Sequence, residues 1–326
     1  MNDTPRPELL PAPEVPDLPD DRHRELKDAF MQTITEVRPQ PARRRWPMIA
    51  VPVAAATMAI ALITVVAVNR ATDRGPEETV AAPIVAIDPG NAKEARAMFD
   101  RLALAAGARP ATSVGSGQFV YVRSKVAWLV FAEPFDSSDG SQSAGEDPQK
   151  LDKVHSREIW LPATAGSKGL IRERGETFGL EGARTNSSYA EMPTEPGALL
   201  RKIYAETKGQ GDDPDDVAFD YIGEALRESI LPPSLAAALY RTAAEIPGVV
   251  LVKDSVDAAG RHGVAVGRTD TLGERTEWIF DPQSYEYLGE RSYLVRDTKV
   301  GKAGMLTATT AVLERAVVNK PGAEPQ

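Results

Sequence analysis

The stretch "VVLVKDSVDAAGRHGVAVGRTDTLGERTEWIFDPQSYEYLGERSYLV", residues 249–295, gives the clearest indication of fold class in this chain. It holds four runs rich in β-branched and aromatic residues, at 249–256, 262–268, 275–281 and 285–295. The connections between these runs are short and contain Gly, Pro or Asp, which is typical of hairpin turns. The stretch therefore predicts an antiparallel meander of four strands.

Helical segments precede the meander, and one more strand follows it. Residues 194–207, 215–230 and 232–246 repeat their apolar residues with the period of a helix, and each has Pro or Asp at its start. The run "MLTATTAVLERAVV", residues 305–318, is expected to form a last strand before a polar tail.

Upstream of these helices we expect one further helix and several strands. Asn91 and Glu94 form a capping-box-like pair at the start of that helix. Its apolar face would hold Ala95, Met98, Leu102 and Ala105, and Gly107 would end it. Residues 118–133 read as a strand or strand pair, 155–163 and 168–179 as two more strands, and 136–150 as a polar loop. This order predicts an α+β domain with a mainly antiparallel sheet and packed helices.

Residues 47–68 are expected to be a single transmembrane helix. They contain no charged residue, and 22 residues of helix span roughly 33 Å, enough to cross a hydrocarbon core of about 30 Å. A cleaved secretory signal would have a shorter apolar core and a short basic leader, whereas 46 residues precede this one. A buried helix of a soluble domain would carry polar residues at helical spacing. An uncleaved anchor is therefore the preferred interpretation.

The residues flanking this helix predict its orientation. Arg43, Arg44 and Arg45 come directly before it, and Trp46 stands where an interfacial aromatic belongs. By the positive-inside rule the N-terminus is cytoplasmic and the larger C-terminal part extracytoplasmic. The expected organisation is a cytoplasmic arm (1–46), the membrane helix (47–68), a stalk (69–90) and an extracytoplasmic domain (91–320). The cell membrane is the expected location.

Charge and cysteine content limit the function classes. The arm carries nine acidic and eight basic residues, so the exported part holds almost all of the net charge of −9. An acidic exterior argues against nucleic acid as a partner. The absence of cysteine excludes disulfides, thiolate metal sites and a lipidated cysteine.

The cytoplasmic arm contains one amphipathic segment. Leu26, Phe30, Ile34 and Val37 fall within an arc of about 80° on a helix of 100° per residue. One such helix cannot bury its own apolar stripe, so we expect it to bind a partner or the membrane surface. The alternative, weighed equally, is a marginal juxtamembrane helix without a specific role. In the membrane helix, the spacings Ala50/Ala54 and Ala55/Ala59 would permit a homodimer, although such spacings are common in Ala-rich anchors.

The exported domain offers no convincing catalytic, metal or cofactor site. Its histidines, His155 and His262, are expected to be solvated loop residues, because no G-x-S-x-G motif is present to complete a triad. The acidic run from Asp213 to Glu224 fails as a calcium loop because Ala218 replaces the required glycine, and helix capping explains it better. The tryptophans at 128, 160 and 278 fall on expected strands; they either form the core against the helices, the favoured interpretation, or line a hydrophobic-ligand cavity.

Several phrases resemble a family of actinobacterial single-pass membrane proteins that are typically encoded beside extracytoplasmic-function sigma factors. They are the Arg cluster before the anchor, "FVYVRS" (119–124), "REIWLPATAGSKGLIRERGE" (157–176), "AALYRTAAEIPGVVLV" (237–252) and the meander through "YLGERSYLV" (287–295). The order of elements also looks like that of periplasmic lipoprotein-carrier and stress-sensor domains, which form a half-barrel. The family resemblance implies an anti-sigma-like regulator whose cytoplasmic arm holds a sigma factor. The zinc-type anti-sigma motif requires cysteine and is excluded here.

From these observations we expect a single-pass signal transducer without catalysis or cofactor, with an extracytoplasmic ligand that the sequence does not identify. The alternative is a membrane-anchored extracytoplasmic lipid- or ligand-binding protein whose arm has no regulatory role.

Overall fold

The structure is a computed structural model that describes residues 79–130, 150–180 and 185–325. All of these belong to one compact unit of the chain. Over those ranges, every helix is too short or too polar to cross a bilayer. The expected membrane helix, 47–68, lies outside them, as do the arm and most of the polar loop at 136–150.

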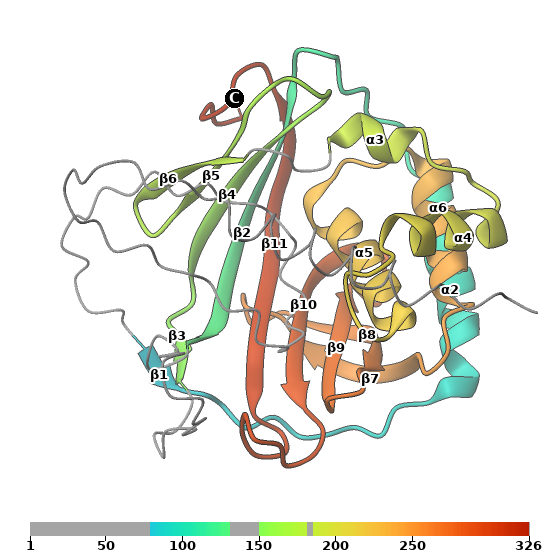
Figure 1. The fold of residues 1–326 in the computed structure, drawn as a ribbon, viewed down its shortest axis with the longest axis vertical. Helices are drawn as coiled ribbons and strands as arrows, with labels where there is room; N and C mark the ends of the chain where they lie inside the picture. The colour runs from blue at the N-terminus through green and yellow to red at the C-terminus, as the bar shows by residue number, and fades with distance from the viewer. Residues whose placement is uncertain (1–78, 131–149, 181–184, 326) are drawn as a thin grey trace, which may run out of the picture. The chain divides into compact units, whose positions relative to one another are not determined.

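The described residues form an antiparallel sheet of eleven strands with helices on one face (Figure 1). Nine strands follow the order β6-β5-β4-β2-β11-β10-β9-β8-β7, and β1 and β3 form a small extension beside β2. The strands are β1 Thr79–Ala81, β2 Phe119–Val130, β3 Lys150–Asp152, β4 His155–Pro162, β5 Gly169–Glu173, β6 Glu176–Leu180, β7 Val250–Val256, β8 His262–Thr269, β9 Glu274–Phe280, β10 Tyr287–Leu294 and β11 Leu306–Val318. The α+β class with a mainly antiparallel sheet is thus confirmed.

The helices gather on one side of the sheet, which bends around them (Figure 1). They are α2 Ala92–Gly107, α3 Asn186–Ala190, α4 Pro196–Glu206, α5 Pro214–Glu228 and α6 Pro233–Ala243. Helix α2 begins as expected: the Asn91 side chain accepts hydrogen bonds from the backbone amides of Lys93 and Glu94. Its buried face contains Phe99 and Ala106, while Ala105 is only half-buried.

The predicted meander is present as β7 to β10, and β11 extends it. One upstream alternative is decided and one upstream prediction is corrected. Of the strand or strand pair expected over 118–133, the described part gives one long strand, β2, because β11 and β4 pair with it along most of its length. The run 168–179 gives two strands, because Arg174 and Gly175 both have positive φ and make a two-residue hairpin turn.

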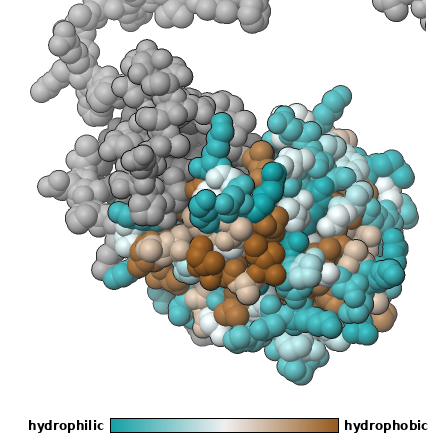
Figure 2. All heavy atoms as spheres, turned by 90° about the horizontal axis from the view of Figure 1, so that it is seen from below, coloured by the Kyte–Doolittle hydropathy of each residue, from teal (hydrophilic) through white to brown (hydrophobic). Residues whose placement is uncertain are grey.

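The folded domain begins before the expected boundary at residue 91. Residues 79–81 form β1, which pairs with β3, and an isolated bridge joins Ile84 to Met305. The segment after β1 then runs along the lower end of the sheet to α2 (Figure 1). Val80 of β1 and Ile84 and Ile87 of this segment are exposed, and Figure 2 shows apolar surface gathered on this side of the domain.

The main core lies between the helices and the sheet. Alternate residues of each strand face it: Val120 and Val122 of β2, Ile159 and Leu161 of β4, and Trp278 and Phe280 of β9. The opposite face carries a smaller cluster of Phe119, Tyr121, Trp160 and Val318.

The three tryptophans therefore have different environments. Trp278 packs under the helices, as the core interpretation requires. Trp160 is buried on the opposite face, where its indole N–H donates to the Ala323 carbonyl oxygen at 2.6 Å. Trp128 is half-buried. The three tryptophans therefore do not share one apolar role, either in the core or along a cavity.

Candidate functional site

Helix α5 ends at the candidate site, and its position is fixed at its first turn. Asp213 caps the helix by accepting from the Asp215 amide, and Pro214 occupies the first position. Arg268 of β8 is buried between Asp213 and Asp216, forming an ion pair with each carboxylate. Capping and ion pairing account for the acidic run that begins at Asp213 and does not fit a calcium loop.

A cavity of about 180 Å³ lies at the other end of α5. Its lining comes from the ends of α2 and α5, from α6, and from β10 and β11: Ala106, Arg109, Pro110, Thr112, Leu226, Ser229, Ile230, Leu231, Pro233, Ala236, Tyr240, Tyr287 and Arg315. Most of these side chains are apolar, and two are arginines. Such a concave site with a few polar groups is the usual form of a small-molecule pocket.

Arg315 is the more buried of the two arginines that line the cavity. One of its terminal nitrogens (Nη2) donates to the Leu226 carbonyl oxygen at 2.5 Å, and its guanidinium lies 5.7 Å from the centre of the Tyr287 ring. Its Nε atom is buried and has no hydrogen-bond partner. Burial lowers the pKa of Arg315, although nearby tyrosines oppose this; arginine nevertheless stays charged at neutral pH because its ordinary pKa is so high.

Hydroxyl groups accompany this cation. The Ser229 Oγ is buried without a hydrogen-bond partner. Tyr240 is also buried, and its burial raises the pKa of its phenol to about 12. At neutral pH the cavity therefore presents hydroxyl groups and a guanidinium within an apolar enclosure.

The last turn of α5 also begins a chain of ion pairs. Arg227 and Glu228 stand between the cavity residues Leu226 and Ser229 in sequence. Arg227 donates to both carboxylate oxygens of Glu290 on β10, at 3.2 and 3.3 Å. Burial and the charge of Glu290 raise the pKa of the neighbouring Asp220 to about 8, so Asp220 is largely protonated at neutral pH.

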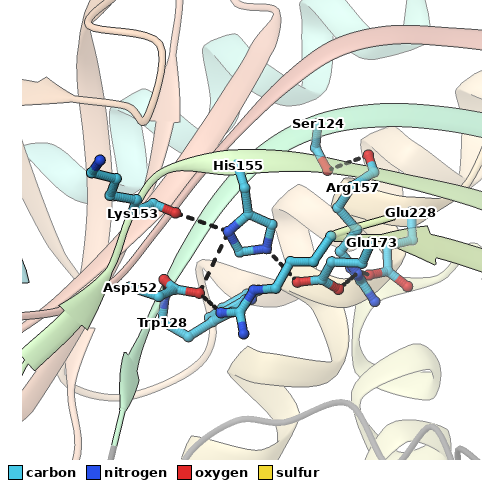
Figure 3. A network of polar contacts seen from close by, with 9 residues as sticks. Ser124, Trp128, Asp152, Lys153, His155, Arg157, Glu173 and Glu228 are labelled. Carbon is cyan, nitrogen blue, oxygen red and sulfur yellow. Dashed lines mark hydrogen bonds and ion pairs between the residues drawn. The ribbon is translucent and has the colours of Figure 1, made fainter. Parts of the chain in front are cut away.

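Glu228 carries the chain in the other direction, onto strands β4 and β5 (Figure 3). It accepts from Nη1 of Arg157 at 2.9 Å, and Nε of Arg157 lies 3.3 Å from Glu173. Glu173 in turn lies 2.6 Å from Nε2 of His155. The pKa of Glu228 is lowered: burial alone would raise it, but the two arginines outweigh that effect.

The chain ends at β3, beside the first described strand. Asp152 of β3 lies 3.4 Å from Nδ1 of His155 and also pairs with Arg174. Its other carboxylate oxygen accepts from the Trp128 amide at 2.5 Å. Because Asp152 is the register partner of Thr79, the contacts run from Glu228, the residue before the cavity-lining Ser229, to β1, which lies within the expected stalk.

One of the two histidines differs from expectation. His262 is exposed and pairs with the equally exposed Asp254. His155 was expected in a solvated loop; it lies instead at the start of β4, with its side chain 16% exposed and both ring nitrogens engaged. Period-two alternation could have shown this, because His155 and Arg157 are in phase with the buried Ile159 and Leu161.

The other sequence-predicted site residues lie outside the described ranges. They are the expected partner-binding residues Leu26, Phe30, Ile34 and Val37 and the orientation residues Arg43, Arg44, Arg45 and Trp46. These assignments stay predictions.

The environment of His155 predicts a pH dependence of stability. Burial lowers the pKa of His155, but the hydrogen bonds to Glu173 and to the Lys153 carbonyl outweigh burial and raise it. The imidazolium therefore stabilises the fold fully below its unfolded-state pKa of about 6.5, and this contribution is lost as pH rises through the higher folded-state pKa. We expect His155→Gln to lower the free energy of unfolding by up to about 1 kcal/mol at pH 5.5 and by much less at pH 8.5.

Thermal unfolding of the full-length chain across this pH range measures the difference. His262→Gln is the matched control, because that exposed histidine should give the wild-type profile. A difference in stability between wild type and His155→Gln that is the same at all pH values would contradict the prediction.

Comparisons with known proteins add a structural likeness only. No family model matches the chain, and no curated protein matches it. A chain in the structure of the Pseudomonas aeruginosa MucA/MucB complex is similar at 17% identity and a TM-score of 0.22, over 72% of this chain and 59% of that one. MucB in complex with MucA(peri) is similar at 16% identity and a TM-score of 0.21, over 72% of this chain and 57% of that one. MucB alone is similar at 15% identity and a TM-score of 0.21, over 72% of this chain and 61% of that one.

This chain thus spans about three fifths of the length of the solved chains it matches. At these values the likeness does not establish a function. The resemblance to the actinobacterial family also stays a prediction.

Proposed function

We propose that this chain is a single-pass membrane signal transducer of the anti-sigma type. Its extracytoplasmic domain would hold a ligand in the cavity at the end of α5. Its cytoplasmic helix would hold a sigma factor through Leu26, Phe30, Ile34 and Val37. The domain would have no catalytic role.

The continuous ion-pair chain is the observation that carries this proposal. It links Glu228, the residue before the cavity-lining Ser229, through Arg157, Glu173 and His155 to Asp152 on β3. A purely structural core needs no such chain, since apolar residues of similar volume pack at least as stably. In this domain the chain ends where β3 holds β1, so it joins the cavity to the segment that leads toward the expected membrane helix.

A ligand can act on this chain by preferring one arrangement of the last turn of α5. Leu226 and Ser229 would contact the ligand, while Arg227 and Glu228 between them hold the ion pairs. A ligand shifts an equilibrium only through its different affinity for the two arrangements. A shift of this turn would change the geometry at Arg157 and, through it, the hold of β3 on β1. The stalk, the membrane helix or its dimer would pass the change to the arm.

The cytoplasmic half of the proposal predicts that Phe30→Asp abolishes sigma-factor retention. A charge in the middle of the apolar stripe removes the surface that a helix-in-groove partner would cover. The measurement is affinity purification of the tagged full-length chain from its native cells, with bound proteins identified by mass spectrometry. Gln32→Asp adds the same charge on the opposite side of the expected helix and should retain the partner.

Loss of the sigma factor in both variants would mean that charge alone, and not the stripe, matters. If wild type retains no sigma factor, the regulatory proposal fails. The cavity then favours the second candidate function, a membrane-anchored extracytoplasmic ligand- or lipid-binding protein.

A further inference from the structure

We propose that the cavity at the end of α5 binds a small monocarboxylic acid with a compact apolar body. This inference names the ligand class for the site of the proposed function and rests on that function for its biological role. The binding itself is a property of the domain and can be tested separately.

The two arginines of the cavity supply the charge argument. Arg109 donates to the carbonyl oxygens of Ser284 and Tyr285, at 3.4 and 3.1 Å. Arg315 donates to those of Leu226 and Arg227, at 2.5 and 3.4 Å. Within the described ranges, neither arginine forms an ion pair with a carboxylate. Two cations that share one cavity without a carboxylate favour an anion there.

Nearby acids do not fill this role. Glu286 acts on Arg315 through its charge but forms no ion pair with it among the described residues. Glu228 and Glu290 are engaged by Arg157 and Arg227 in the ion-pair chain. The Nε of Arg315 and the Oγ of Ser229 remain buried and without a hydrogen-bond partner. A buried donor without an acceptor is costly, so a carboxylate toward which these two side chains turn would remove a penalty that the domain now carries.

The walls of the cavity define the rest of the ligand. Ala106, Leu226, Ile230, Leu231 and Ala236 contribute apolar surface to the lining. The volume of about 180 Å³ is slightly larger than an apolar cavity of roughly 150 Å³ that accepts benzene. One ring or a short branched chain therefore fits inside, whereas a long acyl chain would have to extend into solvent. A phosphate or a dicarboxylate would place charge against the apolar wall at a desolvation cost.

Benzoate and its neutral isostere benzamide test this assignment. The full-length chain is titrated with each in lipid nanodiscs, and binding is followed calorimetrically and by saturation-transfer NMR. We expect benzoate to bind at least tenfold more tightly than benzamide. Phenylacetate, cyclohexanecarboxylate and octanoate extend the panel, and octanoate should be the weakest of the acids because of its length.

Four variants locate the site. Arg315→Gln and Arg109→Gln should each weaken benzoate binding tenfold or more. Ala236→Phe should abolish it by filling the cavity while leaving both charges in place. Arg96→Gln is the matched control, because Arg96 is an exposed arginine of α2 whose hydrogen bond within the described residues also goes to a carbonyl oxygen. This variant should bind benzoate as wild type does. Arg109 is exposed, so its variant should fold even if Arg315→Gln does not.

Three results would overturn the proposal. They are equal affinity for benzoate and benzamide, undiminished benzoate binding in Arg109→Gln and Ala236→Phe, or no binding by any acid of the panel. The co-purification with Phe30→Asp is independent of all three. Acid binding without a sigma factor would support the anchored binding protein, and a sigma factor without acid binding would leave the regulator with a different stimulus.

Discussion

Replacing Trp278 by alanine should lower the free energy of unfolding by about 4 kcal/mol, within the range for removal of a buried aromatic side chain. Trp278 is fully buried on the helix-covered face of β9. Its ring stacks on Phe219 of α5 with centroids 3.8 Å apart and planes 8° apart. Removing it would leave a cavity between the sheet and the helix that carries the candidate site. Chemical denaturation of the full-length chain, followed by circular dichroism, measures the loss.

Gly223 provides an independent variant at the same contact. A Cβ at this position would lie 2.7 Å from Nε1 of Trp278, so Gly223→Ala must push α5 away from the sheet and should destabilise by about 2 kcal/mol. Trp128→Ala is the matched control, because Trp128 is half-buried and its loss should have an effect of about 1 kcal/mol. Equal losses for Trp128→Ala and Trp278→Ala would contradict the burial argument.

Elements with a strong local pattern were predictable from the sequence. Asn91 and Glu94 mark the start of α2, and the prolines at 196, 214 and 233 lie at the first positions of α4, α5 and α6. Each meander strand carries its own β-branched residues and is followed by a short turn. In these places local preference and tertiary structure agree, so periodicity and capping suffice.

Strands that depend on distant partners were not predictable. β1 and β3 have three residues each, too few for a period, and they exist because β3 pairs with both β1 and β2. Trp160 shows a related limit. Its aromatic character indicates burial, but only the phase of β4 shows that it faces away from the helices.

The candidate site combines both situations. The cavity brings together Arg109 and Arg315, which are 206 positions apart in the sequence, and no local pattern relates them. The ion-pair chain did leave a signal. Arg157 is in phase with Ile159 on β4 and Glu173 with Ile171 on β5, so each polar side chain points toward the helix-covered core. Polar residues on an apolar face predict a partner, although not which one.

Glu228→Gln should lower the free energy of unfolding by about 3 kcal/mol at pH 7, since removal of one partner leaves buried charges uncompensated. The side chain is buried between Arg157 and Arg227, and glutamine keeps its shape but not its charge. The pKa of Glu228 is lowered in the fold. Its stabilising effect is therefore present above the unfolded-state pKa and is lost as pH falls through the folded-state value. The difference in the free energy of unfolding between wild type and Glu228→Gln should therefore be smaller at pH 4 than at pH 7.

Glu245→Gln is the control, because Glu245 is exposed after α6 and should change stability little at either pH. A gap that stays as wide at pH 4 as at pH 7 would show that the carboxylate charge is not the cause.

A double variant separates stability from coupling. Arg157→Met with Glu228→Leu removes both members of the pair and should recover much of the stability, because apolar residues can replace a buried ion pair. Hydrogen exchange at β1 then reports whether α5 still influences that strand. Faster exchange at residues 79–81 in the double variant, at near wild-type global stability, would mean that the ion pairs hold β1 through β3. Unchanged exchange would mean that the pairs serve the core alone, and the proposed route from the cavity to the membrane would fail.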